Sequence, residues 1–250
     1  LRKFLPSVGV ELPPTQNPKA FTHFELSSAL AGTTQALRFT DARIKLDSTS
    51  LSGSFGSQNL ALGAVFAQLE GDNINLDDYL PPAEKEPQTA QTSPAKSAPS
   101  AGLGNNPLPP APTENPWSTA KVLPLETLRS LNLDAQLKFQ ELTAQTLPLR
   151  QLQLNLHAAQ GVLQLKEFSA SLYEGKISSN ASLNAKTNTP KINLNTTIND
   201  VPVEKLLAAL EQEALMEGQI MLAGKFNTQG NSEREWVANL NGTGNFKVNQ

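Results

Sequence analysis

The chain has 250 residues, of which 38% are hydrophobic and 17% charged, with a formal net charge of −3 and no cysteine. That length can bury the core of one large or two modest domains, whereas the scattered charges form no basic patch for nucleic acid. The sequence contains no run of about 18 apolar residues that would suggest a membrane-spanning helix. The lack of thiols excludes disulfides and Cys-bound metals.

We interpret residues 1–80 as part of a β unit that is related to the second half of the chain. The segment 73–80 (NINLDDYL) corresponds to 200–207 (DVPVEKLL), 127 positions later, and 37–41 (LRFTD) corresponds to 163–167 (LQLKE). A spacing that drifts where turns differ in length is typical of repeated strand arrays. Because the chain starts at Leu1 and ends within a strand pattern, we expect further sequence at both ends.

Residues 81–124 are predicted to be a disordered linker rich in proline and alanine. This segment holds eleven of the eighteen prolines, and its apolar residues larger than valine are few. Such a composition buries too little surface to offset the entropy of ordering. Pro-rich ligands of SH3 or WW domains have a similar composition. Because no basic residue flanks a clean PxxP core, we favour a linker.

Residues 125–250 are predicted to form a second β unit, truncated at its end. Apolar and polar residues alternate with a period of two in several runs, which is typical of strands with one apolar and one polar face. Turns such as Gln160-Gly161 and Glu174-Gly175 separate the runs and indicate an antiparallel meander. The residues expected to share one continuous apolar surface are Leu152, Leu154, Leu156, Leu163, Leu165, Leu172, Ile177, Leu183, Ile192, Leu194 and Ile198.

A few short helices complete the prediction. A helical period at 203–215 follows Asp200 as a candidate N-cap, and a shorter helix is expected around 234–240. The fold class is therefore mainly β. What covers the apolar strand faces stays open at this stage. A second sheet would make a closed β-sandwich, whereas a single meander sheet curled into a β-groove would leave an apolar trough.

The sequence does not point to an enzyme, and we expect no catalytic residue, no metal and no cofactor. His157 falls in the polar register of its strand, and His23 lies near the start, so both favour ordinary surface positions. The pair Asp77-Asp78 fits the start of a helix better than a metal site. The chain contains no P-loop, H-E-x-x-H or G-x-S-x-G motif.

Several segments together resemble the AsmA family. The segment 71–82 (GDNINLDDYLPP) with the Pro-rich stretch after it is similar to the region that precedes the C-terminal domain of these proteins, and 128–135 (LRSLNLDA) is similar to the opening of that domain. The segments 161–176 and 239–246 resemble its central and closing strands. The order and spacing of these segments cover most of the chain.

The resemblance implies a periplasmic β-groove segment of a protein that an N-terminal helix, outside this sequence, anchors in the bacterial inner membrane. It implies binding or conduction of phospholipid between the inner and outer membranes, in the manner of bridge-like lipid transport proteins, and support of outer-membrane biogenesis. The expected partners are phospholipid acyl chains, the inner membrane and outer-membrane assembly factors. The alternative is a structural or interaction module that assists outer-membrane protein assembly without holding lipid.

Overall fold

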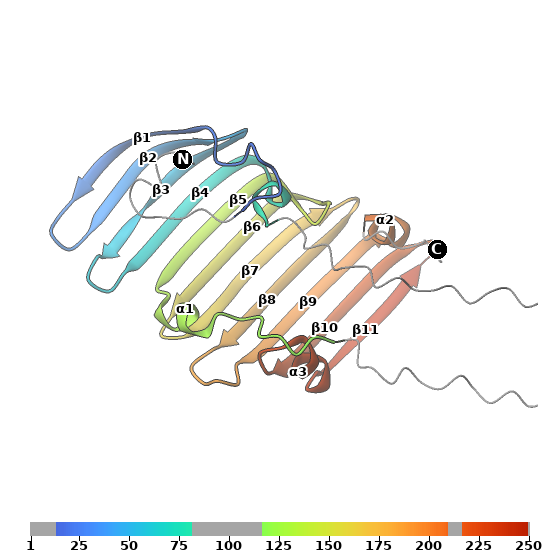
Figure 1. Cartoon of the computed structure of the whole chain (residues 1–250). Helices are drawn as coiled ribbons and strands as arrows, with labels where there is room; N and C mark the ends of the chain where they lie inside the picture. Colours follow the sequence, from blue (N-terminus) through green and yellow to red (C-terminus); the bar gives the residue numbers. More distant parts are fainter. Residues whose placement is uncertain (1–13, 82–116, 210–216, 250) are drawn as a thin grey trace, which may run out of the picture.

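The computed structural model describes residues 14–81, 117–209 and 217–249 (Figure 1). Within these ranges, eleven strands form one open, curled sheet in which each strand lies beside its neighbour in the sequence. The strands are β1 (Phe24–Gly32), β2 (Leu37–Leu46), β3 (Thr49–Asn59), β4 (Ala64–Asn75), β5 (Leu133–Ala144), β6 (Leu147–Ala159), β7 (Val162–Leu172), β8 (Gly175–Asn184), β9 (Lys191–Pro202), β10 (Gln219–Gln229) and β11 (Asn241–Asn249).

The strand order confirms the predicted fold class of a mainly β meander. Neighbouring strands pair antiparallel at every step except one, because β4 and β5 run parallel. A parallel pair needs a long connection that returns to the starting end, and the chain between Asn75 and Leu133 supplies it. The described strands belong to a single sheet, so they do not form the closed sandwich that was the alternative.

The strands form because apolar and polar residues alternate along them. In β6, Leu152 is buried and Leu154 half-buried, whereas Gln151 and Gln153 are exposed. Residues directly opposite each other in paired strands lie on the same side of the sheet, so one side collects most of the apolar residues of the strands. Its best buried part contains Leu142, Leu152 and Ala170, with half-buried residues packed around them.

Bulges keep the apolar residues on one side where the alternation slips. The register shifts by one residue at Thr40-Asp41 in β2, at Lys166-Glu167 in β7 and at Asn199-Asp200 in β9. The extra residue of a bulge returns the apolar side chains that follow it to the same side of the sheet. In β7, for example, Leu165 and Phe168 are three positions apart, yet both side chains lie on the same side of the sheet.

Short helices lie at both ends of the strands (Figure 1). The 3-10 helix η2 (Leu76–Tyr79) follows β4, and α2 (Val203–Ala209) follows β9 at the same edge. At the opposite edge, α1 (Leu125–Ser130) precedes β5 and α3 (Glu233–Ala238) follows β10. The helix predicted at 203–215 begins at Val203, and residues 210–216 lie outside the described ranges. The shorter helix predicted around 234–240 corresponds to α3, which Ser232 caps.

The predicted linker is described only in part. Residues 82–116 lie outside the described ranges. Residues 117–124, which we call the strap, run along the edge that carries α1 and α3 (Figure 1). The strands of segments 1–80 and 125–250 belong to the same sheet, since β4 pairs directly with β5.

Candidate functional site: an apolar strip between two rims

The eleven residues predicted from the sequence lie on one side of the sheet. Leu163 of β7 is opposite Leu183 of β8, which in turn is opposite Ile192 of β9. Leu156 pairs with Leu165, and Ile177 pairs with Ile198. Leu152 and Leu172 are buried, at 5% and 2% exposure, and the other nine are half-buried.

The apolar surface extends well beyond these residues, into strands that the sequence reasoning did not assign to it. We call the whole apolar side of the sheet, from Phe24 in β1 to Phe246 in β11, the apolar strip. On one side it continues through Leu137, Leu69 and Phe55, and the rings of Phe39 and Phe55 stack at 4.7 Å. On the other side Leu222 pairs with both Ile198 and Phe246. The alternation of apolar and polar residues at 131–139 was the signal in the sequence that could have extended the predicted surface into β5.

A hydroxyl pair interrupts the strip near its middle. The hydroxyls of Ser179 in β8 and Thr196 in β9 are 2.7 Å apart and hydrogen-bond to each other. The next residue in the same row is Gly224, and the ring of Phe226 leans over it, so a Cβ at position 224 would lie 2.5 Å from that ring. At this point of the strip the two hydroxyls therefore satisfy each other's hydrogen-bonding capacity.

One edge of the strip is closed by a rim that we call the η2–α2 rim, made of η2, the β5–β6 turn and α2. The Asp77 carboxylate accepts hydrogen bonds from the backbone N–H groups of Gln145 and Thr146, at 2.7 and 3.0 Å. The Thr146 hydroxyl then donates to the carbonyl of Ala209 at 2.8 Å. Asp77 therefore stabilises a turn with two positive-φ residues, and this explains the acidic residue at that position.

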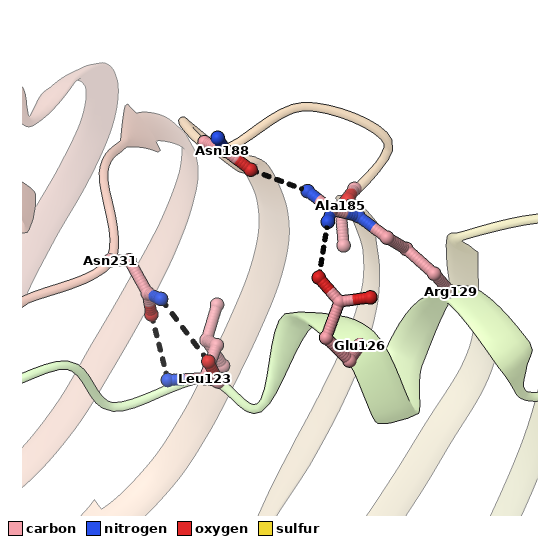
Figure 2. A network of polar contacts seen from close by, with 6 residues as sticks. All are labelled: Leu123, Glu126, Arg129, Ala185, Asn188 and Asn231. Atoms are coloured by element: carbon pink, nitrogen blue, oxygen red, sulfur yellow. Dashed lines mark hydrogen bonds and ion pairs between the residues drawn. The ribbon is translucent and has the colours of Figure 1, made fainter.

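The opposite edge is closed by the strap, α1 and α3, which together we call the α1–α3 rim. Figure 2 shows two polar clamps that hold it. Asn231 accepts from the Leu123 N–H at 2.7 Å and donates to the Leu123 carbonyl at 3.1 Å. Arg129 donates to the Ala185 carbonyl, to Asn188 and to Glu126, at 2.9, 2.9 and 2.8 Å.

The two rims cover residues of different size. Near the η2–α2 rim the buried residues are large, namely Leu172, Val201 and Val203, each below 5% exposure. Near the α1–α3 rim the buried apolar residues are Ala158, Ala185 and Pro190, each below 2% exposure, and two of these three are alanines. Since larger side chains bury more apolar area, the second rim depends more on its hydrogen bonds.

The other side of the sheet is polar, and it carries two open hollows of about 680 and 650 Å³. Each hollow forms at a bulge, one beside Lys166-Glu167 and the other beside Thr40-Asp41. Side chains pair across strands here, as in the hydrogen bond of 2.7 Å from Asn195 to Asn180. Most of this side is solvated strand surface, as the polar register predicts.

Both histidines occupy the polar surroundings expected from the sequence. His157 lies 3.9 Å from Asp134 on the polar side. Its Nδ1 atom and the Oδ1 atom of Asn155 are buried, and neither has a hydrogen-bond partner among the described residues. His23 lies 3.0 Å from Glu25. Among the described residues, three or more His, Asp or Glu side chains do not gather into a group that could hold a metal ion.

The fold and the strip define a class of protein: an open, single-layer β-sheet with one long apolar side between two rims. The chain belongs to the AsmA family, because the model of that family matches residues 1–250. No curated protein and no solved structure shows a significant match. Family membership suggests a role in outer-membrane assembly or lipid transport at the cell envelope. Across the described ranges, no helix has both the length and the apolar character needed to span a membrane.

Proposed function

We propose that the apolar strip binds the acyl chains of phospholipids and conducts them along the sheet. The observation that carries this proposal is the partial exposure of the strip. Nine of the eleven strip residues predicted from the sequence are half-buried, and the described strands provide no second sheet over them. Soluble proteins rarely expose an apolar surface of this extent without a ligand or partner.

The dimensions of the strip suit extended apolar ligands. Eleven strands at about 4.8 Å spacing give a strip roughly 50 Å long across the sheet. Each methylene group that leaves water for such a surface contributes about 0.8 kcal/mol. An acyl chain therefore binds without a specific polar contact, and it can shift along the strip with little change in free energy.

The family supports an envelope setting for this activity. We propose that the segment acts in the periplasm, that an N-terminal anchor outside this sequence holds the protein to the inner membrane, and that lipid passes between the inner and outer membranes. In this role the protein is not an enzyme, because holding and conducting a lipid breaks no covalent bond. Outer-membrane assembly factors are its proposed protein partners.

Site-specific photocrosslinking in cells tests the proposal. A photoreactive residue at Leu165 faces the strip, whereas one at Lys166 lies in the same strand beside the polar hollow. We expect phospholipid to be captured from position 165 and not from position 166. Capture at neither position, from a monodisperse protein, would instead support a module that assists outer-membrane protein assembly without holding lipid.

A further inference from the structure

A third hollow, of about 560 Å³, lies at the α1–α3 rim. The strap and the start of α1 form one wall, with Lys121 and Leu125. The β8–β9 connection and the start of α3 form the other, with Asn188, Asn231 and Arg234. The strap therefore bridges this hollow instead of packing tightly against the strand ends.

The charged side chains around this hollow differ in whether they have partners. Glu126 is paired with Arg129 at 2.8 Å, and Glu235 accepts from the Asn231 N–H at 2.7 Å and from the Ser232 hydroxyl at 3.2 Å. By contrast, within the part of the chain that the structure describes, the side chains of Lys121 and Arg234 form no ion pair or hydrogen bond. Among the described residues, therefore, the two carboxylates have partners, whereas the two cations are available to an anion.

The hollow lies at the end of the sheet where β9 begins, close in sequence to a residue of the apolar strip. Asn188 lies in the connection that leads into β9, and Ile192 of the strip is the second residue of that strand. Leu123 and Leu125 contribute half-buried apolar surface from the strap side. Two cations thus stand at the margin of a surface suited to acyl chains, as an amphipathic ligand requires.

We propose that this hollow binds the phosphodiester headgroup of a phospholipid whose acyl chains lie on the apolar strip. Lys121 and Arg234 pair with the phosphate, and the side-chain N–H groups of Asn188, whose Oδ1 atom accepts from Arg129, donate to the phosphate oxygen atoms or to the neighbouring ester. Arginine and lysine are the usual protein partners of phosphate. The inference rests on the proposed function, and it adds a fixed position for the polar end of the lipid.

The test compares two fluorescent lipids with identical acyl chains, phosphatidylglycerol and diacylglycerol, in titrations of the full chain. We expect the wild-type protein to bind phosphatidylglycerol more tightly. The K121Q/R234Q variant should lose about tenfold in affinity for phosphatidylglycerol, since two exposed charge contacts are removed, and should keep its affinity for diacylglycerol. The control K225Q/K247Q removes the same charge from β10 and β11 at polar-register positions and should change neither affinity.

The other outcomes separate the explanations. An equal loss for both lipids in K121Q/R234Q, or no loss for either, overturns the headgroup site. If inorganic phosphate binds the wild-type protein as tightly as phosphatidylglycerol does, the hollow is a free-phosphate site and not a lipid site. If the wild-type protein binds neither lipid, the proposed function itself fails before any variant is compared.

Discussion

At the scale of single residues, Asp47 shows how one carboxylate organises the first end of the sheet. It occupies the β2–β3 turn with a φ of 54° and accepts hydrogen bonds from the N–H groups of Phe21, Thr22 and His23, at 2.7 to 2.9 Å. The Tyr79 hydroxyl donates to it at 3.0 Å. Asp47 thereby ties the segment before β1 to η2.

These contacts shift the pKa of both partners. Partial burial raises the pKa of Asp47, but the hydrogen bonds from the His23 and Phe21 N–H groups and from Tyr79 outweigh it, so the pKa lies below its ordinary value. Burial and the neighbouring Asp47 carboxylate raise the pKa of Tyr79 to about 12. The ionised aspartate and the neutral tyrosine are therefore the forms that the folded state prefers.

Replacing Asp47 by asparagine should lower the free energy of unfolding by about 1 kcal/mol at pH 7, as for a lost cap. Because the folded-state pKa of Asp47 is lowered, its contribution is fully present above about pH 4. It is lost as the pH falls through the folded value. Urea unfolding of both proteins at pH 7 and at pH 3 checks this, and an equal difference at both values contradicts it.

At the scale of elements, the two sides of β6 should respond differently to the same charge. Leu154 lies on the apolar strip beside Phe168, whereas Gln153 is exposed and opposite Lys138. Leu154→Asp places a carboxylate on the apolar side and should lower the free energy of unfolding by about 2 kcal/mol or more. Gln153→Asp should change it by less than about 0.5 kcal/mol. Urea denaturation measures both, and similar losses would show that the strand faces are not distinct.

The strands could be predicted from the sequence because alternation is a local property of each run. Leu152, Leu154 and Leu156 show it without any knowledge of a partner strand. The bulges were not predicted, although the signal is present, since Leu165 and Phe168 are separated by three positions and not two. A bulge is an unequal match between two strands, and one strand read alone does not reveal which partner residue is passed over.

The rims could not be predicted, because their contacts join residues far apart in the chain. Asn231 clamps Leu123 across 108 positions, and Arg129 reaches Ala185 across 56. Nothing in the local sequence marks Asn231 as different from the other asparagines of this Asn-rich chain. The parallel pairing of β4 and β5 could not be predicted either, because a meander pattern predicts antiparallel neighbours.

At the scale of the whole molecule, the β4–β5 pair joins the strands that precede the Pro-rich segment to those that follow it. Ten residue pairs align from Val65↔Leu133 to Asn75↔Thr143. Lys138 and Glu70 form an ion pair at 2.8 Å across the pair. Phe139 packs over Gly71, where any Cβ would lie 2.4 Å from the ring. The apolar strip is continuous only while this seam holds.

Cutting the chain between the two strands tests how strongly the seam binds. With a specific protease site inserted near position 100, cleavage should leave both fragments together in size-exclusion chromatography, because ten ladder pairs and the apolar strip hold them. Gly71→Val should release the fragments after cleavage, since its side chain displaces Phe139. Gln68→Val, on the exposed polar side of the same strand, should not. Separation of the unmutated fragments without denaturant would instead mark segments 1–80 and 125–250 as two independent units.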